Sequence, residues 1–207
     1  MDDSNGFNSN FSSNQFNTSQ PDETALDRSY LECEEMFAKA DELIKEGDIK
    51  GAVETLFKIT QRSPQFGKAY NHLGWVYENK YKNYSKAEEF YKKALQYSPE
   101  YPASYLNYTY FLSNLSRYDE LKTHLDKSLT IPSVAKETLY NEYAIMLEMQ
   151  QKPQEAMDFY VKAAMTTLES TKLEQYKASI ERCKQKLELK NSLGGYYPSS
   201  GNYQDYK

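Results

Sequence analysis

The sequence has few of the residues that build catalytic and metal sites. It contains only two His, His72 and His124, and only two Cys, Cys33 and Cys183. No Cys or carboxylate lies at metal-ligand spacing from either His. With eight Gly in the chain, no glycine-rich phosphate loop is formed either. We therefore expect no enzyme activity, no cofactor and no metal site, and we interpret both Cys as small buried hydrophobic residues.

The sequence also lacks a basic field and a long apolar run. Its formal net charge is −5, and an acidic chain does not attract phosphate backbones or anionic lipid. No stretch has the length of a membrane span, and the N-terminus shows no basic segment followed by an apolar run. We expect no nucleic-acid partner, no direct membrane insertion and a cytoplasmic location.

What the sequence does contain is a repeat of about 35 residues. Two columns of residues share this period, with spacings of 35, 34 and 35 in the first and 34, 35 and 35 in the second: Ala52, Ala87, Leu121 and Ala156, then Leu43, Tyr77, Leu112 and Leu147. Pro64, Pro99 and Pro132 each follow an apolar helical stretch that a proline would end. The chain is therefore built from successive units of one kind.

Each unit contains two runs of apolar residues at helical spacing, separated by a short polar turn. In the first unit the turn is the segment 46–48, Glu-Gly-Asp. Pro102 and Pro153 are well placed at first helical positions. Ser85 with Glu88 and Thr171 with Glu174 have the spacing of capping boxes. Each unit is thus predicted to be a helical hairpin.

Small residues and aromatics recur at fixed columns of these units: Ala40, Gly74 and Ala144, with Tyr77, Tyr91 and Tyr160. With the prolines at the unit ends, this pattern resembles the tetratricopeptide repeat over roughly residues 33–168. The resemblance implies an all-α fold, a right-handed α-solenoid of four helical hairpins plus a C-terminal capping helix. Small residues are needed where two helices cross closely. The third unit departs from the pattern at Thr109, Leu121 and Ser128, so we expect its helices to pack at a looser angle.

The expected domain organisation has four parts: an Asn/Ser/Phe-rich tail over 1–25, four hairpins over 26–168, a capping helix over 169–190 and a Tyr-rich tail over 191–207. The apolar stripe of the capping helix is narrow, and the helix is too short to contain the number of heptads that a coiled-coil seam needs. We therefore interpret it as a cap that covers the last hairpin.

Both tails are predicted to be disordered, because they cannot bury enough apolar surface to offset chain ordering. They carry regularly spaced aromatics: Phe7, Phe11 and Phe16 in the first, Tyr196, Tyr197, Tyr203 and Tyr206 in the second. Two interpretations stay open. The tails are solubilising segments, or they dock on another subunit or in the chain's own groove.

The resemblance also implies where a partner would bind, because in this family the first helix of each hairpin lines the concave surface. The corresponding columns here are Phe37, Asp41, Asn71, Trp75, Leu106, Asn107, Tyr110, Asn141 and Ile145. We predict that Trp75, Tyr110 and Ile145 form one wall, with the Asn amides beside it. Aromatics are effective anchors, and amides pair with a peptide main chain of any sequence. The alternative for Trp75 and Tyr110 is packing between neighbouring repeats.

Two functions follow from these expectations. The first is a protein-interaction module, an adaptor or chaperone that binds a peptide segment in the concave groove. The second is a structural subunit of a larger assembly, such as a secretion apparatus, docked through its convex face and tails. Asp41 argues against one specialised role of the family, the clamping of a C-terminal carboxylate, because it would repel that group. The oligomeric state stays open.

Overall fold

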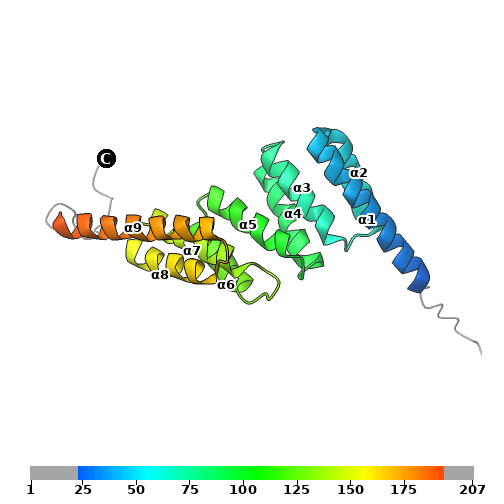
Figure 1. The fold of residues 1–207 in the computed structure, drawn as a ribbon. Coiled ribbons are helices and arrows are strands. Elements are labelled where there is room, and N and C mark those ends of the chain that lie inside the picture. The colour runs from blue at the N-terminus through cyan, green and yellow to red at the C-terminus, as the bar shows by residue number, and fades with distance from the viewer. Residues whose placement is uncertain (1–22, 194–207) are drawn as a thin grey trace, which may run out of the picture.

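The computed structural model describes residues 23–193, and over that range the chain is helical without any strand (Figure 1). Its helices are α1 (Glu23–Glu46), α2 (Ile49–Arg62), α3 (Gly67–Asn79), α4 (Tyr84–Tyr97), α5 (Pro102–Asn114), α6 (Tyr118–Ser128), α7 (Lys136–Met149), α8 (Pro153–Thr166) and α9 (Ser170–Ser192). α1 to α8 pair in chain order as four hairpins, and α9 packs on α8. The fold is therefore an all-α repeat solenoid, as predicted.

The helix ends differ slightly from the predicted domain limits. α1 begins at Glu23 and α9 ends at Ser192, so each helix extends two or three residues into a segment predicted to be a tail. The aromatic residues of both predicted tails lie outside the described residues.

All four hairpin turns share one backbone feature. In each turn, the residue two positions before the start of the second helix has a positive φ. These residues are Gly47, Lys82, Ser116 and Gln151, spaced by 35, 34 and 35 positions. Only the first is a glycine, with a φ of 85°, although glycine adopts this conformation at the lowest cost. The repeat therefore keeps the same turn conformation even where no glycine stands at this position.

The caps of two helices correct the sequence-based assignment. α4 begins at Tyr84, and its cap is Asn83, whose side chain accepts a hydrogen bond from the Lys86 backbone N–H at 3.1 Å. α9 begins at Ser170, so Thr171 already lies inside it. The two predicted capping boxes are therefore wrong, because the helices start earlier than their spacing implied. Pro102 and Pro153 do stand at helix starts, as predicted.

In the second and fourth hairpins, a tyrosine at the same repeat position joins the two helices. A Cβ atom added at Gly74 of α3 would lie 2.6 Å from the ring of Tyr91 of α4, so the two helices meet across this glycine. The Tyr91 hydroxyl donates to Glu78 at 2.7 Å. In the fourth hairpin, Tyr160 likewise donates to Glu148 at 2.8 Å. The small residue at Gly74 is thus required by close helix packing, as predicted.

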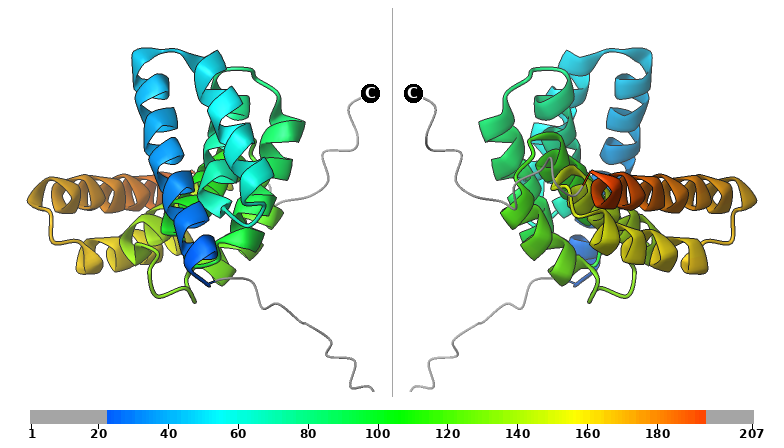
Figure 2. Two further views of the ribbon diagram at one scale, coloured as in Figure 1. Left: turned by 90° about the vertical axis from the view of Figure 1, so that its right-hand side faces the viewer. Right: turned by 90° about the vertical axis from the view of Figure 1, so that its left-hand side faces the viewer.

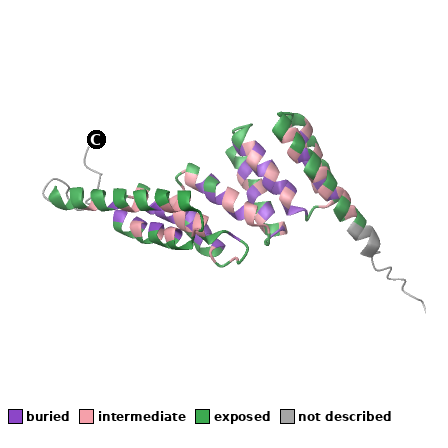
Figure 3. Cartoon of the chain, in the orientation of Figure 1, coloured by how far each residue is buried: buried purple, intermediate pink, exposed green. Residues whose placement is uncertain are grey.

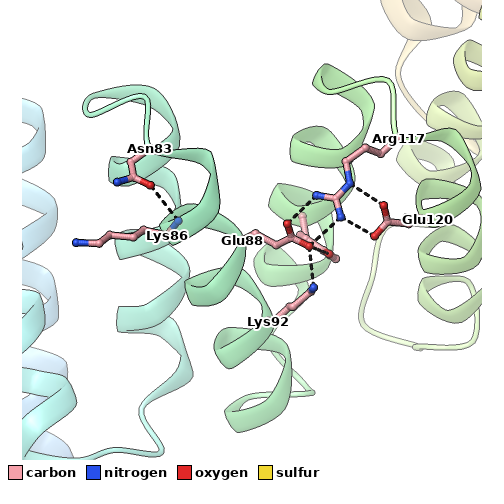
Figure 4. Close-up of polar contacts among 7 residues, drawn as sticks. Asn83, Lys86, Glu88, Lys92, Arg117 and Glu120 are labelled. Atoms are coloured by element: carbon pink, nitrogen blue, oxygen red, sulfur yellow. Dashed lines mark hydrogen bonds and ion pairs between the residues drawn. The ribbon is translucent and has the colours of Figure 1, made fainter.

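The third hairpin is built differently. Leu125 takes the column of Tyr91, and α5 and α6 lie less closely together than the helices of the other hairpins. Arg117, at the start of α6, instead bonds Glu88 of the preceding hairpin at 2.7 and 2.9 Å (Figure 4). It also bonds Glu120 of its own helix. The third hairpin is thus the less closely packed one, and polar links to the neighbouring hairpin accompany this difference.

Two hydrophobic cores run through the solenoid. One joins α1, α2, α3 and part of α4 and includes Cys33, and the other extends from α4 to α9 and includes Cys183. Both Cys are buried and free, as predicted. The buried residues follow the contacts between successive helices, while much of α9 is exposed (Figure 3). The first two hairpins run crosswise to α8 and α9, so the solenoid turns between its two ends (Figure 2).

Candidate peptide-binding surface

A cleft of about 380 Å³ opens between three helices in the second half of the solenoid. Its lining comes from α5, α7 and α9: Tyr110, Glu137, Thr138, Asn141, Lys172, Gln175, Tyr176 and Ser179. Two of the residues predicted from the sequence, Tyr110 and Asn141, are therefore brought together. Tyr110 is 40% exposed and belongs to neither hydrophobic core, so part of its side chain is open to the cleft.

The charged groups of this cleft are paired with one another. Glu137 accepts a hydrogen bond from Lys172 at 3.1 Å and another from the Tyr176 hydroxyl. Lys172 also contacts Glu169 at 2.9 Å. Burial and the Glu137 carboxylate raise the pKa of Tyr176, so its hydroxyl stays a donor at neutral pH. The remaining polar lining consists of amides and hydroxyls, which both donate and accept hydrogen bonds.

The predicted asparagines of α3 and α5 are bonded to each other rather than open to a ligand. Asn71 is 1% exposed, and its side-chain oxygen accepts from the amide of Asn107 at 3.1 Å. The buried Asn71 amide cannot contact a peptide main chain without displacing this partner. The pair instead ties the second hairpin to the third.

The first predicted residues on this surface also contact the following helix. Asp41 of α1 lies 2.7 Å from the His72 Nε2 atom of α3. The ring of Phe37 packs edge-on against His72 at 4.4 Å between centroids. These residues of the first hairpin therefore join α1 to α3.

The other predicted aromatic and aliphatic residues lie outside the cleft. Trp75 is half-buried, belongs to neither core, and has the ammonium group of Lys80 5.4 Å from its ring centroid. Leu106 and Ile145 are partly buried against the larger core. The three-residue wall predicted for Trp75, Tyr110 and Ile145 is thus represented in the cleft by Tyr110 alone.

Sequence reasoning missed the contribution of α9, which was assigned only a capping role. Four of the lining residues come from this helix. A signal was present, because a step of 35 positions from Asn141 leads to Tyr176, and the same step from Ile145 leads to Ile180. α9 thus continues the columns of the first helices, and it adds lining as well as covering α8.

Two classes of feature are not found among the described residues. No group of three or more His, Cys, Asp or Glu side chains there could hold a metal ion. Within residues 23–193, no helix has the length and apolar character needed to cross a membrane.

Residues 67–101, which make up the second hairpin, match the tetratricopeptide repeat family. No curated protein matches the chain. Solved structures are similar at low identity, which establishes the shared fold. The structure from the functional characterisation of Pseudomonas aeruginosa pilF is 17% identical with a TM-score of 0.64, over 84% of this chain and 80% of that one.

Two further structures support the same fold. BtubC from P. vanneervenii is 16% identical with a TM-score of 0.60, over 89% of this chain and 90% of its own. TTC0263, a thermophilic TPR protein of Thermus thermophilus, is 19% identical with a TM-score of 0.54, over 76% of this chain and 86% of its own. The resemblance predicted from the repeat columns is therefore confirmed.

Proposed function

We propose that this chain, a tetratricopeptide-repeat protein by the match of its second hairpin and by its fold, is an adaptor or chaperone that binds a peptide segment of another protein. The bound segment lies in the cleft between α5, α7 and α9. The observation that carries the proposal is the meeting of Tyr110 and Asn141 with the polar side chains of α9 in one open cleft.

The chemistry of the lining defines the kind of segment. Glu137 and Lys172 neutralise each other, so the cleft offers no net charge to select an acidic or a basic ligand. Amide and hydroxyl side chains suit the alternating donors and acceptors of a main chain. The exposed ring of Tyr110 offers a rigid surface for one apolar or aromatic side chain. We therefore propose an extended, uncharged segment with one such anchor.

A peptide-display selection on the full chain tests the proposal. Enriched peptides are measured by fluorescence anisotropy against the wild type and the double variant Tyr110→Ala/Asn141→Ala. Loss of one aromatic anchor and one amide should weaken binding roughly tenfold to a hundredfold. Tyr84→Ala is the matched control, because Tyr84 is 44% exposed and lies outside the cleft. Equal affinity for the double variant and the control would refute the proposed site.

A second candidate function, a structural subunit of a larger assembly, is favoured by one observation. The last turn of α8 and the short link to α9 expose apolar side chains, with Met165 82% and Leu168 fully exposed. Exposed apolar patches on a repeat protein mark interaction surfaces. Met165→Glu/Leu168→Glu should then remove the chain from its native complex in size-exclusion chromatography of a cell extract. Unchanged elution would exclude this surface as the contact.

The proposal includes a cytoplasmic location. Its support is that Cys33 and Cys183 are free thiols, which persist most readily in a reducing compartment. Cell fractionation with an antibody against the chain tests this part separately.

A further inference from the structure

A continuous row of aromatic rings lies between α2, α3 and α4, away from the cleft. Neighbouring ring centroids are 5.1 to 6.4 Å apart along the series Tyr97, Tyr70, Phe90, Tyr77 and Tyr81. Phe57 of α2 joins this row through Phe90, at 6.0 Å. Together with Lys86 and Lys93, we name these residues the aromatic–lysine ladder.

The two lysines lie over the rings. The Lys93 ammonium group is 5.7 Å from the ring centroid of Tyr70 and 5.9 Å from that of Phe90, and Lys86 is 5.4 Å from that of Tyr77. Along α4, the residues at positions 86, 90, 93 and 97 read Lys, Phe, Lys, Tyr at spacings of 4, 3 and 4, so they share one face of the helix. The ladder thus combines cations and aromatic faces.

The ladder is only partly covered by the rest of the described chain. Tyr81 is 46% exposed, both lysines are exposed, and Phe57, Tyr77 and Phe90 are half-buried. The ion pairs of this helix use Lys92, which bonds Glu88 at 2.7 Å, and leave Lys86 and Lys93 without a carboxylate within residues 28–193. A partner for this surface must therefore bring carboxylates and apolar or aromatic side chains.

Residues 1–22 of the same chain have this composition. They contain Phe7, Phe11 and Phe16, the acidic residues Asp2, Asp3 and Asp22, and no Lys, Arg or His. Aromatic rings pack on aromatic faces, and carboxylates are attracted by ammonium groups. The segment and the ladder are complementary in both respects.

The point of attachment favours binding within one molecule. α1 extends past the end of α2 (Figure 1), and Tyr30, near its start, packs at 5.5 Å on Phe66 of the loop before α3. The α4 part of the ladder, from Tyr97 to Lys86, spans about 16 Å at the helical rise. The 20 residues from Asp3 to Asp22 can span up to about 66 Å. Tethering near the ladder also raises the effective concentration of the segment.

From these observations we infer that residues 1–22 dock on the aromatic–lysine ladder of their own chain, with phenylalanines on the exposed rings and Asp2 or Asp3 at Lys86 or Lys93. The docked segment covers the outer side of the first two hairpins. It leaves the cleft between α5, α7 and α9 free, so this inference and the proposed function stand independently.

Zero-length carbodiimide coupling on the full chain tests the inference, because this reagent joins a carboxylate only to an ammonium group in contact with it. Mass spectrometry of the monomer band should identify links from Asp2 or Asp3 to Lys86 or Lys93. The variant Phe7→Ser/Phe11→Ser/Phe16→Ser should lower their yield roughly tenfold or more, as the loss of buried phenylalanine side chains implies. Its substitutions lie outside the residues that the structure describes.

A matched pair of lysine variants completes the experiment. Lys122→Gln/Lys127→Gln changes two exposed lysines of α6 and should leave the links unchanged. Lys86→Gln/Lys93→Gln should remove them without moving them to other lysines. Links spread evenly over the exposed lysines, or a yield unaffected by the phenylalanine variant, would overturn the inference. Links found only in a dimer band would also overturn it, because the segment would then bind a second copy.

Discussion

The second and third hairpins are aligned repeats with the same turn but different interiors. In the second, Tyr91 packs over Gly74 and bonds the buried Glu78. In the third, the corresponding positions are Leu125, Thr109 and Ser113, and this bond cannot form. In the third hairpin the buried His124 of α6 bonds the Tyr105 carbonyl oxygen of α5 at 3.0 Å, and Arg117 adds a link to Glu88 of the neighbouring hairpin. A repeat can therefore keep its backbone path when its internal contacts change and links to the neighbouring repeat are added.

The strongest test of this comparison is a large side chain at the helix crossing. Gly74→Leu would force α3 and α4 apart, because even a Cβ atom would lie 2.6 Å from the Tyr91 ring. We expect a loss of about 3 kcal/mol or more in the free energy of unfolding, measured by urea denaturation. Thr109→Leu introduces the same side chain in the same column of the third hairpin and should cost less, about 1–3 kcal/mol, because a branched side chain already stands there. Equal losses would show that the two crossings are equally close.

The next largest effect is expected at the link between hairpins. Arg117→Ala leaves Glu88, whose side chain is 19% exposed, without its bidentate partner (Figure 4). The expected loss is about 1–3 kcal/mol in the same denaturation experiment. Lys122→Ala removes a more exposed pair with Asp126 inside the third hairpin and should cost under about 0.5 kcal/mol. A loss no greater for Arg117 than for Lys122 would contradict the assigned role of the link.

The same link predicts a pH dependence. Arg117, with a smaller contribution from Lys92, lowers the pKa of Glu88 from 4.5 to about 2. Because the folded-state pKa is depressed, the stabilisation is complete above the unfolded-state pKa and is lost as the pH falls from about 4.5 toward 2. The difference in unfolding free energy between wild type and Arg117→Ala should therefore shrink between pH 6 and pH 3, as measured by urea denaturation at each pH. A constant difference would mean that the Glu88 charge is not involved.

The tyrosine hydroxyls should matter more in the second hairpin than in the fourth. Tyr91→Phe leaves the buried Glu78 with one long contact, from Asn114 at 3.4 Å, and should cost about 1–2 kcal/mol. Tyr160→Phe leaves Glu148 bonded to Arg182 and Lys186 at 2.6 to 2.8 Å, so its loss should stay below about 1 kcal/mol. Thermal unfolding measures both losses. A greater loss for Tyr160→Phe than for Tyr91→Phe would show that the contacts of Arg182 and Lys186 with Glu148 are weak.

The smallest effect is expected at the shared turns. Ser116 has a φ of 54°, which favours glycine. Ser116→Gly should therefore stabilise the third hairpin by up to about 1 kcal/mol. Lys82→Gly, at the same position of the second hairpin, should give a similar gain. A loss of stability in both variants, seen as a lower melting temperature, would show that the turns are not strained.

Much of the fold could be predicted because the repeat presents the same requirement several times. The columns of Ala52 and Gly74 located the helix crossings, and the helix starts at Pro102 and Pro153 were correct. The caps were less predictable, since Asn83 and Ser85 compete for one helix start and local spacing alone does not decide between them. Of the candidate site, only single residues such as Tyr110 and Asn141 were predicted correctly. Which polar side chains bond to one another depends on which helices meet, and the sequence pattern does not show that.

The sequence by itself determined the helical hairpins, their number and the looser third unit, since these depend on periodicity and on side-chain size at helix crossings. Tertiary structure decided which polar side chains pair with one another and which line open space. Asn71 and Asn141 are the same residue type on the same predicted surface, yet the first is buried against Asn107 and the second lines the cleft. The reason is physical: the surroundings of each amide come from a helix one repeat away, α5 for Asn71 and α9 for Asn141, and local spacing does not decide which side chains of that helix meet it.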